Sequence, residues 1–288
     1  MNPQIMVIGA LGNVGSEVVK CLLAQGVSVR AADLFPEKVR QRFGNGVESV
    51  LFDFAKPETF APAFKGIQKL FLMRPPQISN IQKYMVPALE ATKAAGVKHM
   101  VFLSLIGIEQ NKVVPHYKVE QWLLASGLDY TFLRCSFFMQ NLNTTHRAEI
   151  RERDEIYIPV GNAKTSFLDV RDIGAVAALA LTQPGHEKKA YDLTGSEALD
   201  YYQVAGLFSQ VLGRKITYKN PSALGFFVSQ LQHKSNLMFA LVTTWLYTNT
   251  RNGMANVLTG EVLRLLGRKP ILMSQYIEDY KGSFIQPD

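Results

Sequence analysis

Three glycines near the start of the chain have the spacing of a phosphate-binding turn. They follow the apolar run Ile5-Met6-Val7-Ile8, and a helical pattern of apolar residues follows them. The first glycine allows a tight turn, the second lets backbone approach a diphosphate, and the third lets a helix pack close to a strand. Unpaired amides at the start of that helix attract an anion. We therefore predict a dinucleotide site formed by Gly9, Leu11, Gly12, Asn13, Val14 and Gly15.

A carboxylate closes the second predicted strand, residues 27–32. Asp33 stands where a carboxylate accepts the ribose hydroxyls of NAD and repels the additional phosphate of NADP. NAD(H) is therefore the favoured cofactor. NADP(H) remains an alternative, because the cations of Arg30 and Lys38 are close in sequence.

The ends of the next three predicted strands carry further candidate ligands, because open α/β sheets bind ligands at the carboxyl ends of their strands. Asp53 and Phe54 follow the third strand and are predicted to contact adenine. Arg74 follows the fourth and either reaches a cofactor phosphate or an acidic substrate, or stays on the surface. Ser104 ends the fifth and either touches the nicotinamide ribose or only forms a turn.

Strand and helix patterns alternate through the first half of the chain. Such alternation predicts a doubly wound parallel sheet, because each crossover helix returns the chain to the same edge. The fold class is therefore α/β and Rossmann-like, with a smaller and mainly helical C-terminal region. We expect residues 1–155 to form the nucleotide-binding domain, ending in a helix from about 138 to 152. Residues 156–288 should supply late sheet elements and a substrate-binding cap.

Composition excludes several other classes. The formal charge of +7 is not gathered into runs of Lys and Arg, so a nucleic-acid partner is not expected. The start of the chain has no targeting pattern, which predicts a cytoplasmic protein. Cys21 and Cys135 have no metal-ligand spacing, and no metal is predicted.

The segment between Asp200 and Glu261 contains no acidic residue. It is also apolar and aromatic, but its strongest run, residues 237–247, is too short to cross a bilayer, so no transmembrane segment is predicted. Three interpretations remain: ordinary core, a lid over an apolar pocket, or a contact with a second copy of the chain or a regulatory protein.

Several motifs together resemble those of the NmrA-like branch of atypical short-chain dehydrogenases. They are the glycine turn and the segments 125–134, 137–142, 167–173 and 191–195. The resemblance covers nearly the whole chain. It implies either an NAD(P)H-dependent reductase of quinones and dyes or a redox sensor that binds the cofactor and regulates a partner.

The chain departs from the wider superfamily where catalysis is usually recognised. It lacks the Tyr-x-x-x-Lys pair, and His116 and Glu120 stand in its place. This pair is similar to that of the type 2 quinone oxidoreductases, with His116 as a donor to the substrate and Glu120 orienting it. A near-neutral pKa would suit His116 for proton transfer, although a helix-end histidine often only bonds to its loop. Leu34 replaces the arginine common in NADP-using relatives, which again favours NAD.

The resemblance places the substrate pocket after the sixth strand, between the sheet edge and the C-terminal helices. We expect Phe137, Phe138 and Asn141, together with Tyr117, to contact the substrate. The preferred function is hydride transfer to a planar, apolar acceptor such as a quinone, which needs no protein nucleophile. The alternatives are a sensor without turnover and a sugar-nucleotide epimerase or dehydratase, the latter disfavoured by the missing tyrosine and lysine.

Overall fold

The chain forms two compact units and passes between them more than once. The computed structural model describes residues 4–232, 236–251 and 253–285. The first unit comprises Met1–Cys135 and Val170–Leu193, and the second comprises Ser136–Asp169 and Thr194–Asp288. The division differs from a single boundary at 155, because the last strand of the first unit comes late in the sequence.

A parallel sheet of seven strands forms the centre of the first unit, in the order β3-β2-β1-β4-β5-β6-β9. Every neighbouring pair is parallel. The order reverses between β1 and β4, and in such sheets this is where ligands bind, at the carboxyl ends of the strands. The predicted doubly wound α/β fold is confirmed. The strands are β1 (Ile5–Ile8), β2 (Val29–Asp33), β3 (Val47–Leu51), β4 (Lys69–Leu72), β5 (His99–Leu105), β6 (Asp129–Cys135) and β9 (Lys189–Leu193).

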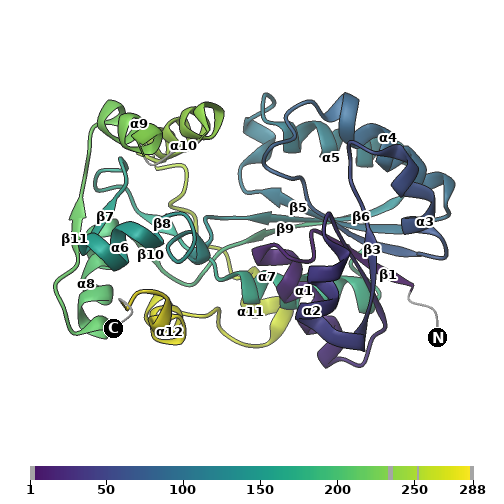
Figure 1. Ribbon diagram of the computed structural model, residues 1–288, viewed down its shortest axis with the longest axis horizontal. Helices are drawn as coiled ribbons and strands as arrows, with labels where there is room; N and C mark the ends of the chain where they lie inside the picture. Colours follow the sequence, from purple (N-terminus) through teal and green to yellow (C-terminus); the bar gives the residue numbers. More distant parts are fainter. Residues whose placement is uncertain (1–3, 233–235, 252, 286–288) are drawn as a thin grey trace. The chain divides into compact units, whose positions relative to one another are not determined.

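Helices cover both faces of this sheet (Figure 1). One face carries α3 (Phe60–Phe64), α4 (Ile81–Ala94) and α5 (Pro115–Ser126). The other carries α1 (Asn13–Ala24), α2 (Pro36–Phe43) and α7 (Val170–Thr182). The short helix η3 (Ile108–Gln110) lies in the connection from β5 to α5.

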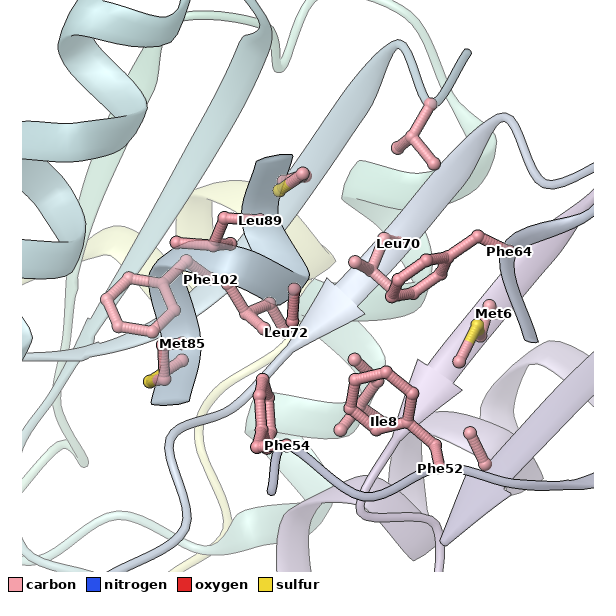
Figure 2. Packing of buried hydrophobic residues seen from close by; sticks show 14 of the residues in the cluster. Met6, Ile8, Phe52, Phe54, Phe64, Leu70, Leu72, Met85, Leu89 and Phe102 are labelled. Carbon is pink, nitrogen blue, oxygen red and sulfur yellow. The ribbon is translucent and has the colours of Figure 1, made fainter. Parts of the chain in front are cut away.

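The core explains why the central strands are apolar without alternation. All four residues of β1 are buried, because helices cover both sides of the sheet. Met6 and Ile8 pack with Phe52 and Phe64 on the α3 and α4 side (Figure 2). Burying one such side chain contributes roughly 1.5 to 3 kcal/mol, so this cluster holds the strand that leads into the glycine turn.

The second unit consists of short strand pairs and helices. Its strands are β7 (Glu155–Tyr157), β8 (Thr165–Ser166), β10 (Ala198–Leu199) and β11 (Thr217–Lys219). Its helices are η4 (Met139–Asn141), α6 (Arg147–Arg153), α8 (Tyr201–Leu212), α9 (Ala223–Gln232), α10 (Leu237–Thr250), α11 (Glu261–Leu266), α12 (Met273–Asp279) and η5 (Lys281–Ser283).

The α-helix expected from residue 138 begins only at Arg147. The Asn and Thr residues of 141–145 compete with the helical backbone for hydrogen bonds. Thr144 Oγ1, for example, donates to the Gln140 carbonyl at 2.7 Å. The predicted long helix is therefore wrong over its first half.

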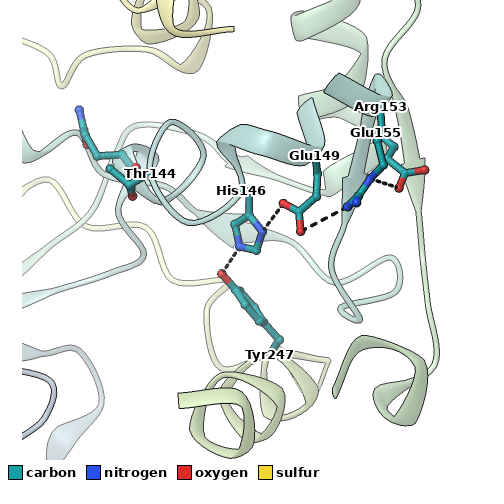
Figure 3. Close-up of polar contacts among 7 residues, drawn as sticks. Thr144, His146, Glu149, Arg153, Glu155 and Tyr247 are labelled. Carbon is teal, nitrogen blue, oxygen red and sulfur yellow. Dashed lines mark hydrogen bonds and ion pairs between the residues drawn. The ribbon is translucent and has the colours of Figure 1, made fainter. Parts of the chain in front are cut away.

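A buried polar chain joins α6 to α10 (Figure 3). His146 Nδ1 lies 3.3 Å from Glu149 Oε2, and His146 Nε2 lies 2.8 Å from the Tyr247 hydroxyl. Burial raises the pKa of Tyr247, so its hydroxyl stays protonated and can donate to the imidazole. Both nitrogens of His146 therefore have protein partners. Among the described residues, no three His, Cys, Asp or Glu side chains are grouped as a metal ion would require.

Helices α9 and α10 expose many large apolar side chains. No helix in the described part of the chain combines the length and apolar character needed to span a membrane. The lid or contact role of the segment after Asp200 stays a prediction. The exposed residues are Leu224, Val228, Leu231, Leu237, Met238, Phe239, Leu241, Val242, Trp245 and Leu246.

Candidate nucleotide and active site

The three glycines make the turn from β1 into α1 as tight as the sequence indicates. Gly9 has a φ of +72°, a left-handed conformation that favours glycine. A side chain at Gly15 would collide with the Gly9 carbonyl, so the absence of one lets α1 pack against the turn. Gly12 is the N-cap of α1, with extended backbone and no side-chain cap. The first amides of α1 are therefore left without a capping side chain, which fits a diphosphate.

Asp33 supports this turn from the end of β2. Its Oδ2 accepts from the Leu11 amide at 3.1 Å, and its Oδ1 accepts from the Leu34 amide at 2.8 Å. Each carboxylate oxygen has a second lone pair, so the pair can still accept ribose hydroxyls. Leu34 itself is 52% exposed. The position of Asp33 beside the glycine turn fits its predicted role.

The two arginines near Asp33 differ in whether their guanidinium is free to meet a cofactor. Arg30 donates to Glu48 and to the carbonyls of Ala63 and Lys65, and it is buried. Its guanidinium is therefore occupied by contacts with β3 and with the end of α3. One residue that sequence reasoning missed is Arg42 of α2, whose Nη1 donates to the Leu11 carbonyl at 3.1 Å. An exposed guanidinium thus lies against the glycine turn.

The candidate adenine residues form the turn after β3. Asp53 Oδ1 accepts from the Ala55 amide at 2.9 Å. The Phe54 ring is buried and packs edge-on against Phe52, with their centroids 4.8 Å apart. Their contact with adenine stays a prediction.

Arg74 binds its own loop and His116. Its Nη1 donates to the carbonyls of Pro75, Pro76 and Ile78, and its Nε makes a long 3.5 Å hydrogen bond to His116 Nε2. Since a guanidinium only donates, Nε2 is the acceptor, and the proton of the neutral imidazole is assigned to Nδ1. The structure brings these two predicted site residues together.

The expected near-neutral pKa of His116 is wrong. Burial, together with the neighbouring Arg74 charge, lowers the pKa of this imidazole to about 3. At neutral pH the side chain is therefore uncharged, and it can donate a hydrogen bond from Nδ1 but cannot act as an imidazolium acid. An unfolded histidine has a pKa of about 6.5. The stability contributed by the neutral form is therefore complete above pH 6.5 and is lost as the pH falls toward 3.

Glu120 lies one turn after His116 on α5, but its hydrogen bonds go to other residues. Ser104 Oγ donates to Glu120 Oε1 at 2.5 Å. Arg134 of β6 donates from Nε and Nη2 to the two carboxylate oxygens, at 3.1 and 2.8 Å. Burial raises the pKa of Glu120 to about 7, and the hydrogen bond from Ser104 opposes that rise. Glu120 therefore joins α5 to two strands, rather than orienting His116 by direct contact.

The predicted substrate residues belong to both units. Tyr117 is on α5 in the first unit and is half-buried. Phe137, Phe138 and Asn141 belong to the second unit and are also half-buried. Phe137 stacks on Tyr247 of α10, with their centroids 6.2 Å apart. Their contact with a substrate stays a prediction.

An open parallel sheet with a glycine turn at its point of reversal defines a dinucleotide-binding α/β protein. Comparison with known proteins gives the family, because the sequence model of the NmrA-like family matches residues 1–255. The chain belongs to the NmrA-like family. It is 38% identical to an NAD(P)H azoreductase of Xenophilus azovorans over 222 residues. The matched region covers 75% of this chain and 76% of that protein.

Two further comparisons agree with this assignment. Quinone oxidoreductase 2 of Escherichia coli is 26% identical over 228 residues, covering 77% of this chain and 79% of that protein. The structure of an NADPH-dependent quinone oxidoreductase of E. coli complexed with NADPH has the same fold, with a TM-score of 0.86 at 23% identity over 96% of this chain and 99% of that chain. The predicted family and the prediction of an NAD(P)H-dependent oxidoreductase are confirmed.

Proposed function

We propose that the protein reduces a planar, mostly apolar acceptor such as a quinone, with NAD(P)H as the hydride source. The observation that carries the proposal is a neutral His116 in the first turn of α5, hydrogen-bonded to Arg74. Similarity to an azoreductase and a quinone oxidoreductase supports this class of acceptor. When bound, the reduced nicotinamide supplies the hydride.

The chain's own residues bind and orient the reactants. The glycine turn and the start of α1 hold the diphosphate, and Asp33 accepts ribose hydroxyls. The Ser104 hydroxyl donates its hydrogen bond to Glu120, so toward any ligand its oxygen is an acceptor. The Nδ1–H of His116 stabilises negative charge that develops on the acceptor oxygen, while the nearby Arg74 adds positive potential.

The test is stopped-flow oxidation of bound NADH and NADPH against a panel of quinones, azo compounds and dyes. We expect at least one quinone-like acceptor to oxidise the bound cofactor, because hydride transfer between positioned planar rings needs no protein nucleophile. Aldehydes and simple ketones are the control acceptors and should not react. Bound cofactor that persists with every acceptor contradicts a reductase and favours the cofactor-binding sensor instead.

We further propose that NADH binds more tightly than NADPH. Asp33→Asn should narrow the difference in affinity between NADH and NADPH. The carboxylate repels the 2′-phosphate of NADPH at a cost of roughly 1 to 3 kcal/mol. Fluorescence titration of both cofactors measures the ratio of the two dissociation constants. If the mutation loosens the glycine turn, it weakens the binding of both cofactors equally, because both contain the diphosphate. That loss therefore cancels in the ratio.

Arg42→Ala is the matched variant for this measurement. Because the Arg42 guanidinium lies against the glycine turn, we expect its loss to weaken NADPH more than NADH. An NADPH affinity equal to or above that of NADH in the unaltered protein would contradict the preference. In that case Arg42 outweighs the Asp33 carboxylate.

A further inference from the structure

Arg134 has no part in the proposed mechanism, but it is the centre of a largely buried polar cluster. It is the last but one residue of β6, in register with Ser104 of β5 on one side and Asp192 of β9 on the other. Its side chain is 14% exposed, and that of its partner Glu120 is 2% exposed. Two parallel hydrogen bonds of this kind fix both side chains in one geometry.

The same guanidinium also binds the loop that follows β5. Its Nη1 contacts the carboxylate of Glu109 in η3. Arg134 thus connects β6 with both the helix that carries His116 and the loop that leads to it. Ser104 completes the connection by donating from β5 to the same Glu120 carboxylate.

We propose that Arg134 is a positioning residue for the reductase site. By holding Glu120 and Glu109 at once, it fixes the first turns of α5 and the loop before it, so that His116 stays desolvated beside Arg74. The part of this inference that concerns turnover rests on the proposed function. The part that concerns His116 can be measured without it.

The chemistry of the cluster makes arginine hard to replace. Lysine offers a single ammonium and cannot donate in parallel to both oxygens of Glu120. Burial, with a smaller contribution from the charge of Asp192, already raises the pKa of Glu120 to about 7, and removing the cation altogether takes away the carboxylate's bidentate partner. Loss of the cation would favour the protonated form of Glu120 further, and the hydrogen bond from Ser104 would weaken as the carboxylate charge is lost.

The chain contains a matched control for this experiment. Arg30 also binds a carboxylate through two nitrogens, with Nε and Nη2 at 2.9 and 3.1 Å from the oxygens of Glu48. Its side chain is similarly buried, at 9% exposed. It lies near the start of β2, however, whereas Arg134 lies at the end of β6. If Arg134 had only a structural role, Arg134→Lys should therefore have the same effects as Arg30→Lys.

The experiment measures three quantities for the unaltered protein, Arg134→Lys, Arg134→Met and Arg30→Lys. They are kcat with a quinone acceptor, the dissociation constant of NADH, and the pKa of His116 from NMR titration of the imidazole. We expect Arg134→Lys to lower kcat about tenfold and to leave NADH binding within about twofold, because a small misplacement of a reacting group is costly. The pKa of His116 should rise from about 3 by at least one unit as the ring becomes solvated.

Arg30→Lys should lower the melting temperature and leave all three quantities unchanged. If both Arg134 variants keep the wild-type kcat and His116 pKa, Arg134 is only structural and the proposal is wrong. If the unaltered protein shows no turnover, the proposed function fails, while the NMR titration still decides the positioning role. Glu109→Gln at the exposed end of the cluster is the variant to use if neither Arg134 variant folds, and a raised His116 pKa is expected there too.

Discussion

Replacing Gly12 with valine should abolish NAD(P)H binding while the fold survives. The backbone of Gly12 is extended, with φ −73° and ψ 168°, so a side chain brings no conformational strain. A Cβ there would lie 3.2 Å from the Gly9 carbonyl, a contact that small shifts relieve. The added methyl groups would nevertheless occupy the space through which the diphosphate approaches the start of α1. Losing two charge-assisted hydrogen bonds predicts at least about 100-fold weaker binding.

Fluorescence titration with NADH and a thermal melt check this result together. Gly206→Ala is the control, because a Cβ at that position of α8 meets nothing within 4 Å, and it should leave binding unchanged. Gly15→Ala should instead lower the melting temperature, since its Cβ collides with the Gly9 carbonyl. If Gly12→Val binds NADH with unchanged affinity, the diphosphate does not lie at this turn.

Replacing His116 with alanine should lower the rate of acceptor reduction roughly 10- to 100-fold, less than the usual contribution of an acid or base. The imidazole is neutral at neutral pH, so only a hydrogen-bond donor is lost. NADH affinity should barely change, because the glycine turn and Asp33 carry most of the binding. Single-turnover stopped-flow measurement with saturating quinone separates the rate from the affinity.

Two further observations test the role of this histidine. His116→Gln keeps an N–H donor and should recover part of the rate. The pH dependence of the rate should contain no inflection that is lost in His116→Gln, because the pKa of His116 is held at about 3, whereas Glu120 has a pKa of about 7 and titrates in both proteins. Full activity of His116→Ala would remove the histidine from the mechanism and leave the reductase proposal standing. An inflection near pH 6.5 that disappears in His116→Gln would mean that the imidazole titrates in the working enzyme.

Much of the first unit follows from local pattern. Strands buried on both faces must be apolar throughout, and a chain that returns by helices must make a parallel sheet. These constraints predicted the strands, the glycine turn and the placement of Asp33 and Ser104 at strand ends. The helix predicted from residue 138 does not form over its first half, because a run of Asn and Thr favours turns. Apolar residues on either side of this run make the segment resemble a helix in sequence.

The site depends on neighbours that are distant in sequence. The glycine spacing alone determined the turn, since φ at Gly9 and the close approach at Gly15 are local requirements. The sequence did not reveal that Glu120 binds Ser104 and Arg134, that Arg42 lies against the glycine turn, or that Arg74 lies beside His116. Strand register and helix packing decide such pairs, and a pKa depends on burial and on the charges so assembled. Local sequence therefore determined the nucleotide-binding turn, whereas only the tertiary structure decided the protonation state of His116 and the partners of Glu120.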